Sequence, residues 1–297
     1  MKNNKEQKTE DNKFDVVLMN PPYQKPTNSI GAGQSLWAGF VEKALQLITK
    51  DGHICAIHPS GWRGNVSLSD LTSKMTSKQI EYLEIHNEQD GKKTFGATTR
   101  YDWYVLKNCK NTKNTTIKDQ NGIISSVNLD KMNVIPNMHI DKIESLIEKH
   151  DKERVSILAN YNYSTVKKIV KETKDNEFIY PVIYSTPIKG PTIWYSNTKQ
   201  NGHFGVKKVI LNPSRPIGFV KDYDGEYAMS EYCIGIVCDD NKMVDAVAKV
   251  IENQKTNGFA DIMEACHFTN KVFNKYVISN FRKDFWKEFV NEDGNEI

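Results

Sequence analysis

An uninterrupted run of apolar residues, Val16-Val17-Leu18-Met19, stands near the start of the chain. Continuous apolar runs are typical of a strand that is buried on both faces of a parallel sheet. Asn20-Pro21-Pro22-Tyr23 follows directly, and a Pro-Pro pair cannot continue a central strand because it lacks backbone N–H donors. The pattern therefore predicts a buried strand over residues 14–19 that ends at Asn20.

Helical and strand-like segments alternate in the next part of the chain. The predicted helices cover residues 36–48 and 68–80, and the predicted strands cover residues 53–58, 82–86 and 101–106. This alternation is typical of a parallel sheet, which makes α/β the expected fold class. The loop before the last strand, with residues 95–99 in it, shows no evident helix and permits an antiparallel pairing of the last two strands.

Two polar segments of this part are predicted to be loops. Residues 24–34 are rich in Pro, Thr, Asn, Ser and Gly, and form either a plain surface loop or a lid over a site. Residues 108–120 are rich in Asn, Lys and Thr, and form a surface loop or a hairpin insert.

A change in composition and in the pattern of apolar residues near residue 133 predicts a domain boundary. A helix is expected over residues 138–150, followed by aromatic, glycine-rich strands and then by two helices, which indicates an α+β domain. The strands are expected at residues 179–184, 192–195, 206–211, 218–220 and 233–238, and the helices at 242–253 and 258–265. We therefore expect a disordered leader at residues 1–13, a first domain at 14–133 and a second domain at 134–297.

Composition sets outer limits on the class of protein. The 297 residues are 38% hydrophobic and 26% charged, a globular balance with room for two modest domains. No apolar stretch approaches the ~20 residues that span a bilayer, and the polar N-terminus lacks the apolar segment of a secretory signal. Five scattered cysteines without a C-x-x-C pair disfavour zinc and disulfide frameworks and predict a cytoplasmic location. The net charge of +3 neither requires nor excludes nucleic acid.

The Asn-Pro-Pro-Tyr segment has the groups needed to bind an amino group attached to a flat ring. Asn20 supplies a side-chain carbonyl acceptor, and Pro21 and Pro22 fix the backbone so that their carbonyls point in set directions. Tyr23 supplies an aromatic face on which a base can stack. Two acceptors facing one NH2 group would draw its nitrogen lone pair out of the ring and make it a nucleophile. The alternative is a strand-terminating turn with a surface tyrosine.

This segment resembles the catalytic motif of amino-group DNA methyltransferases, which use S-adenosylmethionine to methylate adenine. The resemblance implies the C-terminal half of a Rossmann-like methyltransferase sheet, with the motif at the end of its catalytic strand. It also implies that Asn20 and the Pro21 carbonyl accept hydrogen bonds from the target amino group, with Pro22 shaping the turn. Tyr23 would stack on the base, which must be flipped out of the duplex before chemistry can reach it.

Phe95 and Arg63 extend this expected site. In the methyltransferase family an aromatic residue before the last strand can sandwich the flipped base, a role that would fall to Phe95, with a buried hairpin phenylalanine as the alternative. The loop Pro59-Ser60-Gly61-Trp62-Arg63 borders the site in similar enzymes. There Trp62 is expected to be structural, and Arg63 to be a DNA phosphate contact or a solvated charge.

The second domain resembles the target-recognition domain that one class of these enzymes carries. Residues 203–210, 224–230 and 281–286 carry this resemblance. Basic and aromatic residues suited to DNA grooves accompany them: Trp194, Tyr195, His203, Lys207, Lys208 and Arg215. Among these, Lys207, Lys208 and Arg215 are the predicted DNA contacts.

The family's cofactor site is missing from the expected place. A glycine-rich turn and an acidic residue precede the motif in enzymes of this domain order, whereas only residues 1–13 precede it here, and Gly31-Ala32-Gly33 does not end a strand. The strand at residues 14–19 should therefore have an exposed edge. Three explanations stay open: a partner chain supplies the cofactor-binding half, the reading frame is truncated, or the protein binds DNA without methylating it.

Several functions are compatible with these features. The first is a DNA adenine methyltransferase of a restriction–modification system or a phage counter-defence, acting without a metal. The second is a non-catalytic DNA-binding or specificity subunit. The third is methylation of another planar amide or amine, such as a protein glutamine or an RNA base. Within the first, cytosine is the alternative target.

Overall fold

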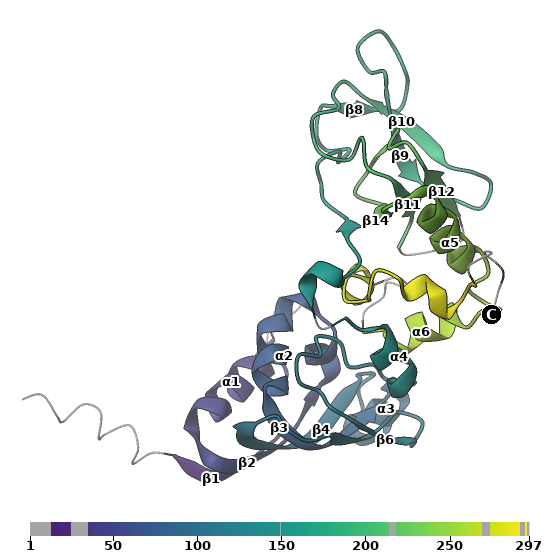
Figure 1. Ribbon diagram of the computed structural model, residues 1–297. Helices are drawn as coiled ribbons and strands as arrows, with labels where there is room; N and C mark the ends of the chain where they lie inside the picture. Colours follow the sequence, from purple (N-terminus) through teal and green to yellow (C-terminus); the bar gives the residue numbers. More distant parts are fainter. Residues whose placement is uncertain are drawn as a thin grey trace, which may run out of the picture. The chain divides into compact units, whose positions relative to one another are not determined.

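The computed structural model describes residues 13–24, 35–148, 150–213, 218–268, 274–291, 295 and 297 (Figure 1). The chain divides into two compact units, Met1–Ser145 and Leu146–Ile297. Of the predicted leader only Lys13 lies within the described residues, and of the predicted loop at residues 24–34 only Gln24 does. The lid interpretation of that loop therefore concerns residues outside the described part.

Unit 1 is built on a six-stranded mixed sheet in the order β1-β2-β4-β3-β5-β6. The strands are β1 (Phe14–Met19), β2 (Ile48–Pro59), β3 (Lys78–His86), β4 (Tyr101–Lys110), β5 (Thr115–Lys118) and β6 (Ile124–Val127). β1 runs parallel to β2, whereas β4 lies between β2 and β3 and is antiparallel to both. The predicted antiparallel pairing of the last two strands is confirmed, and residues 108–120 contribute to a hairpin that widens the sheet.

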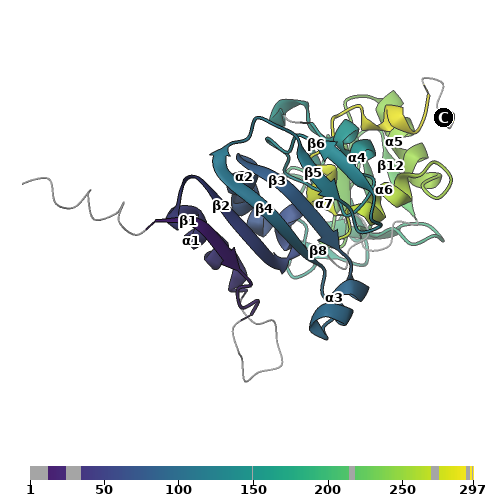
Figure 2. The same cartoon turned by 90° about the horizontal axis from the view of Figure 1, so that it is seen from below.

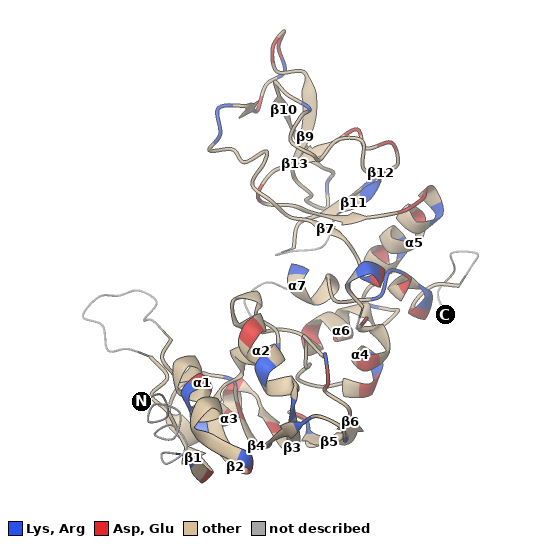
Figure 3. Cartoon of the chain, turned by 60° about the vertical axis from the view of Figure 1, so that its left-hand side comes forward, with Lys and Arg blue, Asp and Glu red and all other residues tan. Residues whose placement is uncertain are grey.

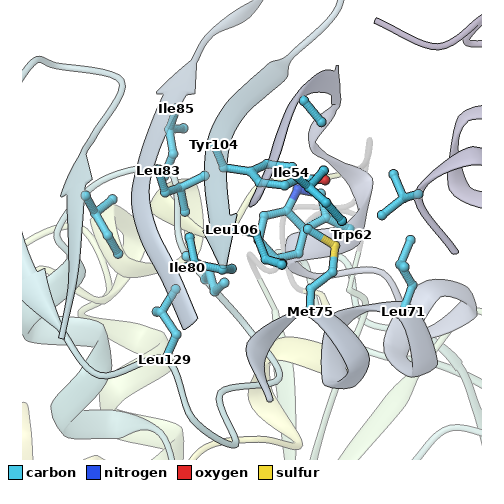
Figure 4. Close-up of a cluster of buried hydrophobic side chains, with 14 of the residues drawn as sticks. Ile54, Trp62, Leu71, Met75, Ile80, Leu83, Ile85, Tyr104, Leu106 and Leu129 are labelled. Atoms are coloured by element: carbon cyan, nitrogen blue, oxygen red, sulfur yellow. The ribbon is translucent and has the colours of Figure 1, made fainter. Parts of the chain in front are cut away.

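Two helices cover one face of this sheet, as Figure 2 shows: α1 (Trp37–Leu47) packs on β2, and α2 (Ser69–Thr76) packs on β3. Two short 3-10 turns, η2 (Ser60–Arg63) and η3 (Val66–Leu68), lead from β2 into α2. The covered face forms the core of unit 1, drawn in Figure 4, where the Trp62 ring lies among residues of β2, β4 and α2. Full burial of one such aliphatic or aromatic side chain is worth about 1.5–3 kcal/mol.

A third helix, α3 (Glu88–Phe95), was missed by the sequence pattern, which shows no apolar period there. Polar groups at its start stabilise it instead of an apolar face. The Asn87 side chain accepts from the backbone N–H groups of Gln89 and Asp90, and the Asp90 carboxylate accepts from the Asn87 N–H. Such a capping box satisfies donors that a helix start leaves unpaired. The predicted loop is thus shorter than expected and begins at Gly96.

The prediction that β1 is buried is wrong. Phe14, Val16 and Leu18 are 53%, 62% and 84% exposed, and only Val17 and Met19 pack toward the core. The exposed side chains alternate with the packed ones, so they lie on the face of the sheet that α1 and α2 do not cover, and β1 also lies at the edge, where no other described strand pairs with its outer side. The expectation of an exposed edge is confirmed. The apolar composition of β1 is typical of a strand that is covered on both faces.

Unit 1 extends beyond the expected boundary at residue 133. Val134 and Ile135 are fully buried, and the Arg63 guanidinium donates to the Ile135 carbonyl and to the Asn137 side chain. These contacts tie residues that follow the sheet back to the turn after β2. Contacts between residues distant in sequence therefore place the division of the chain after Ser145. A change in local composition gives no information about such contacts.

Unit 2 contains two four-stranded sheets, in the orders β13-β9-β10-β8 and β12-β11-β14-β7. The strands are β7 (Ile157–Leu158), β8 (Val170–Lys171), β9 (Tyr180–Ser185), β10 (Thr192–Ser196), β11 (Lys208–Leu211), β12 (Phe219–Asp222), β13 (Ala228–Met229) and β14 (Ile234–Val237). The helical elements that fall in this part are α4 (Ile140–Leu146, across the division), η4 (Asp151–Glu153), α5 (Asn241–Glu252), α6 (Phe259–Ala265), α7 (Lys275–Ile278) and η5 (Phe285–Glu288). The expected fold class, an α/β sheet followed by an α+β part, is confirmed. Within the described ranges no helix has the length and apolar character that crossing a membrane requires.

Candidate functional site

A pocket of about 760 Å³ lies at the carboxyl end of β1. Carboxyl ends of strands are where ligand sites of open α/β sheets form. The residues that line the pocket come from the end of β1, the start of α1, the end of β2, and the segment from the end of α3. They are Asn20, Pro21, Pro22, Tyr23, Gln24, Ser35, Trp37, Pro59, Phe95, Ala97, Thr98 and Thr99. The four motif residues and Phe95, far apart in the sequence, therefore share one cavity.

Two acceptors of the motif are uncommitted within the described residues. The Asn20 side chain is exposed and makes no hydrogen bond with a described residue, and neither does the carbonyl of the buried Pro21. The segment is held in place just beyond them, where the Leu36 N–H donates to the Tyr23 carbonyl at 3.1 Å and Gln24 pairs with Ser35. The motif thus presents free acceptors from an anchored backbone.

Tyr23 and Phe95 form the aromatic side of the pocket. Their ring centroids lie 5.8 Å apart at an interplanar angle of 74°. The Tyr23 hydroxyl is buried without a hydrogen-bond partner among the described residues, and burial, with a smaller effect of Tyr101, raises its pKa. Phe95 is half-buried at the end of α3, so it is not the hairpin phenylalanine of the alternative interpretation.

A ring contact and a close backbone approach define the pocket wall around Phe95. Its ring meets Tyr101 edge to face at 4.9 Å, and Tyr101 stacks on His86 at 4.4 Å. After Phe95 the chain folds back over Gly91 of α3, where an added Cβ would lie 1.9 Å from the Thr99 carbonyl oxygen. Only glycine permits this approach. The position of the pocket wall therefore depends on a helix residue that has no side chain.

Trp37 lines the pocket and packs against His58, and the sequence analysis missed both residues. Their rings stack at 4.3 Å. Nδ1 of His58 lies 3.0 Å from the Pro59 carbonyl and Nε2 lies 3.1 Å from the Tyr104 hydroxyl. Burial lowers the pKa of His58 to about 4, so the ring is neutral at pH 7, with Nδ1 as donor and Nε2 as acceptor. Trp37 could have been noted as an aromatic residue at the start of the predicted helix; His58, in a strand, gives no such signal.

Both predictions for Arg63, a DNA phosphate contact or a solvated charge, are wrong, because the side chain is fully buried. Its Nε donates to Asp102 at 2.7 Å, and Trp62 donates to the same carboxylate oxygen at 2.9 Å. Buried charges require such pairing, since an unpaired one is very costly. The structural role expected for Trp62 is confirmed, and Arg63 shares it.

In unit 2 the predicted contact residues have different positions. Lys208 is fully buried and donates to Asp222 and to the carbonyls of His203 and Val206, so its predicted DNA contact is wrong. Lys207 is half-buried and donates to the Tyr223 carbonyl and the Asn241 side chain, and its DNA contact stays a prediction. Arg215 lies outside the described residues.

The aromatic and histidine residues that were expected to accompany the DNA contacts are buried or partly buried in unit 2. Trp194 stacks on Tyr184 at 4.5 Å. His203 is buried, with Nε2 2.7 Å from the Asn160 side chain, and burial lowers its pKa to about 4. Tyr195 is half-buried on β10.

Residues 1–95 match the family model described as Eco57I restriction-modification methylase. This part of the chain, which holds the motif and reaches Phe95, is thus related to restriction-modification methylases. The match covers less than half of the chain. No curated protein matches it.

Several solved structures are similar to the chain. The type IIL restriction-modification enzyme MmeI in complex with DNA is 12% identical, with 90% of this chain and 45% of that chain covered and a TM-score of 0.40. The type IIG restriction endonuclease BpuSI is 9% identical over 92% and 47%, with a TM-score of 0.37. The type I methyltransferase subunit from Streptococcus thermophilus is 19% identical over 45% and 31%, with a TM-score of 0.28. The chain spans less than half of the length of each of these proteins.

Proposed function

We propose that this chain carries the target-base site of a DNA adenine methyltransferase that uses S-adenosylmethionine, within a restriction–modification system in the cytoplasm. The single observation that supports this most strongly is the pocket in which Asn20, Pro21, Tyr23 and Phe95 meet. The family match over residues 1–95 supports the same reaction class.

The two free acceptors of the motif would bind the two hydrogens of an exocyclic amino group. Asn20 Oδ1 and the Pro21 carbonyl would each accept one of them. These bonds favour a pyramidal amino nitrogen, whose lone pair is no longer shared with the purine ring. The catalytic effect is then one of positioning and electrostatics.

The two rings would hold the flipped base. A flat base between two parallel aromatic faces needs a gap of about 7 Å, twice the ~3.5 Å contact distance. The Tyr23 and Phe95 rings instead touch edge to face at 5.8 Å. We infer that one of the rings turns when the base enters.

The described pocket does not fit the cofactor by itself. Its lining contains no carboxylate for ribose hydroxyls and no glycine-rich turn. S-Adenosylmethionine would supply the methyl group, held mainly by other strands. We propose that those strands, on a partner chain or elsewhere on the same polypeptide, pair with the outer edge of β1, where Val16 and Leu18 are exposed.

DNA is the proposed substrate, and unit 2 the proposed target-recognition part. A non-catalytic DNA-binding subunit is the second candidate, favoured by the lack of a carboxylate in the pocket lining. The two candidates differ in one measurable property, methyl transfer.

The experiment measures transfer of labelled methyl groups to unmethylated DNA, by the chain alone and with the polypeptide encoded next to it. Asn20→Ala should lower transfer by about 10²–10³-fold, the usual cost of one well-placed polar group, and leave DNA affinity unchanged. Asn114→Ala, which removes an exposed amide outside the pocket, is the control. Equal transfer by Asn20→Ala and wild type would refute the role of Asn20. DNA binding without transfer under every partner condition would favour the second candidate.

A further inference from the structure

The positive charge of the chain is concentrated in one segment of unit 2. Residues 165–202 contain six lysines and three carboxylates, a net charge of +3, which equals the net charge of all 297 residues. The rest of the chain is therefore neutral overall. A local excess of this kind, rather than the total charge, is what attracts polyanions.

The fold gathers five of these lysines at one end of the β13-β9-β10-β8 sheet. β8 pairs with the end of β10, with Lys171 opposite Tyr195, and the Asn197 N–H donates to the Ile169 carbonyl. The segments 165–169, 172–179 and 197–202 therefore meet where β10 ends and where β8 and β9 begin. Figure 3 shows basic residues on the loops beside β10. We call this group the lysine end: Lys167, Lys168, Lys171, Lys174 and Lys199.

Four of the five ammonium groups are available to a ligand. Lys167, Lys168, Lys174 and Lys199 are exposed, and none forms an ion pair with a described residue. Lys171 pairs with Asp175. This ion pair, together with hydrogen bonds from two backbone N–H groups, lowers the pKa of Asp175 to about 2.

The carboxylates of the segment do not cancel this charge. Asp175 is neutralised by Lys171, and Glu177 accepts from the Asn197 side-chain amide. Glu172 is the one further carboxylate in the segment, and it is exposed. Four exposed cations thus face two carboxylates without a cationic partner.

Aromatic rings lie beneath two of the lysines. Lys174 Nζ is 5.9 Å from the centre of the Tyr195 ring, and Lys199 Nζ is 5.1 Å from Tyr180 and 5.7 Å from Phe204. Such cation–π contacts restrict where the ammonium groups lie and leave their hydrogens free to donate. Lysines interleaved with aromatic rings are typical of nucleic-acid surfaces.

We propose that the lysine end binds the phosphate backbone of duplex DNA and is the DNA-facing end of unit 2. This inference rests on the proposed function in taking DNA as the substrate. Lysine acts on phosphates as a point charge, so the contacts position the duplex without reading its sequence. The surface differs from the one expected from the sequence, which centred on Lys207, Lys208 and Arg215.

The test compares two variants of the full chain that lose equal charge. One replaces Lys167, Lys168, Lys174 and Lys199 by Gln. The control replaces Lys152, Lys189, Lys242 and Lys255, which are exposed in unit 2 outside the lysine end. Fluorescence anisotropy measures the affinity of each for a labelled DNA duplex of mixed sequence over a range of salt concentrations, after circular dichroism has shown that both are folded.

The lysine-end variant should lose at least tenfold in affinity at low salt, and the slope of log K against log salt should fall by about 3–4, since each phosphate contact contributes about 0.9. The control should keep most of the wild-type slope. Equal losses in both variants, or no loss in the first, would overturn the proposal. Tighter binding of a matched RNA duplex by wild type would overturn it in favour of RNA. DNA binding that depends on the lysine end, without methyl transfer under any partner condition, would refute the proposed methylation and leave this surface standing.

Discussion

The Tyr23 and Phe95 rings meet edge to face, 5.8 Å apart, although 71 positions separate them in the sequence. Each ring fills part of the space that a stacked base would occupy. If a base stacks between the rings as proposed, separating them has a free-energy cost that base stacking must exceed.

Phe95→Ala should weaken productive binding of the target base. Loss of one stacking ring costs about 1–3 kcal/mol, which corresponds to roughly 5–150-fold in kcat/KM for methyl transfer. Phe95→Tyr should retain most activity, because it keeps an aromatic face. Phe40→Ala removes a 48% exposed ring on α1 outside the pocket and should have no effect. An equal effect of the Phe40 and Phe95 variants would contradict a stacking role.

Two glycine-to-alanine changes in helices should have opposite effects on stability. At Gly39, exposed on α1, an added Cβ meets nothing within 4 Å, so Gly39→Ala should stabilise unit 1 by about 0.5–1 kcal/mol. At Gly91 the Cβ meets the Thr99 carbonyl at 1.9 Å, so Gly91→Ala should destabilise the unit and displace the wall from Ala97 to Thr99. Urea unfolding measures the stability, and the NMR signal of the Trp37 indole reports on the pocket. A Gly91→Ala variant as stable as Gly39→Ala would show that the close approach is not required.

The buried pair of Arg63 and Asp102 should behave differently from an exposed one. Asp102→Ala leaves a fully buried guanidinium without its carboxylate and should lower the free energy of unfolding by about 3–5 kcal/mol. Glu42→Ala removes one of the two carboxylates that pair with Lys74, in a pair about half exposed on both sides, and should cause no measurable change. Thermal and urea unfolding of both variants check this. Similar losses at the two positions would contradict the structural role assigned to Arg63.

The free energy of unfolding should decrease as the pH is lowered, partly because of His58. Its pKa is about 4 in the folded protein and 6.5 in the unfolded chain, so below pH 6.5 the unfolded state binds a proton that the folded state does not. The free energy of unfolding is therefore unaffected by the titration of His58 above pH 6.5 and decreases progressively toward pH 4, by about 3 kcal/mol in total. His58→Phe keeps a ring against Trp37 and should remove about one proton from the pH dependence of unfolding between those limits. An unchanged pH dependence would show that folding does not lower the pKa of His58.

The apolar edge of β1 should govern association. Val16→Lys with Leu18→Lys places charge on an exposed edge strand, which is how natural sheets prevent edge pairing. The variant should reduce aggregation of the chain and abolish assembly with the partner that we propose for cofactor binding, as measured by light scattering after size-exclusion chromatography. Ile124→Lys, at a 67% exposed position on β6 at the opposite edge, is the control. Assembly that survives the β1 changes would contradict pairing at this edge.

The sequence by itself determined the elements and the motif. Apolar period, Pro-Pro and glycine act within a few residues, so most predicted helices and strands and the end of β1 at Asn20 follow from local chemistry. The resemblance of the Asn-Pro-Pro-Tyr segment to a methyltransferase motif led to Tyr23 and Phe95, which the structure places in one pocket.

Only the tertiary structure decided which side chains are accessible. Arginine and lysine are usually found at the surface, yet Arg63 and Lys208 are buried. The fold brings a carboxylate from another strand beside each of them, Asp102 beside Arg63 and Asp222 beside Lys208. The apolar run of β1 predicted burial on both faces, but the described helices cover only the face of Val17 and Met19, and β1 has no described neighbour on its outer side. Burial and charge pairing depend on residues distant in sequence, and a local pattern holds no information about which of those residues become neighbours.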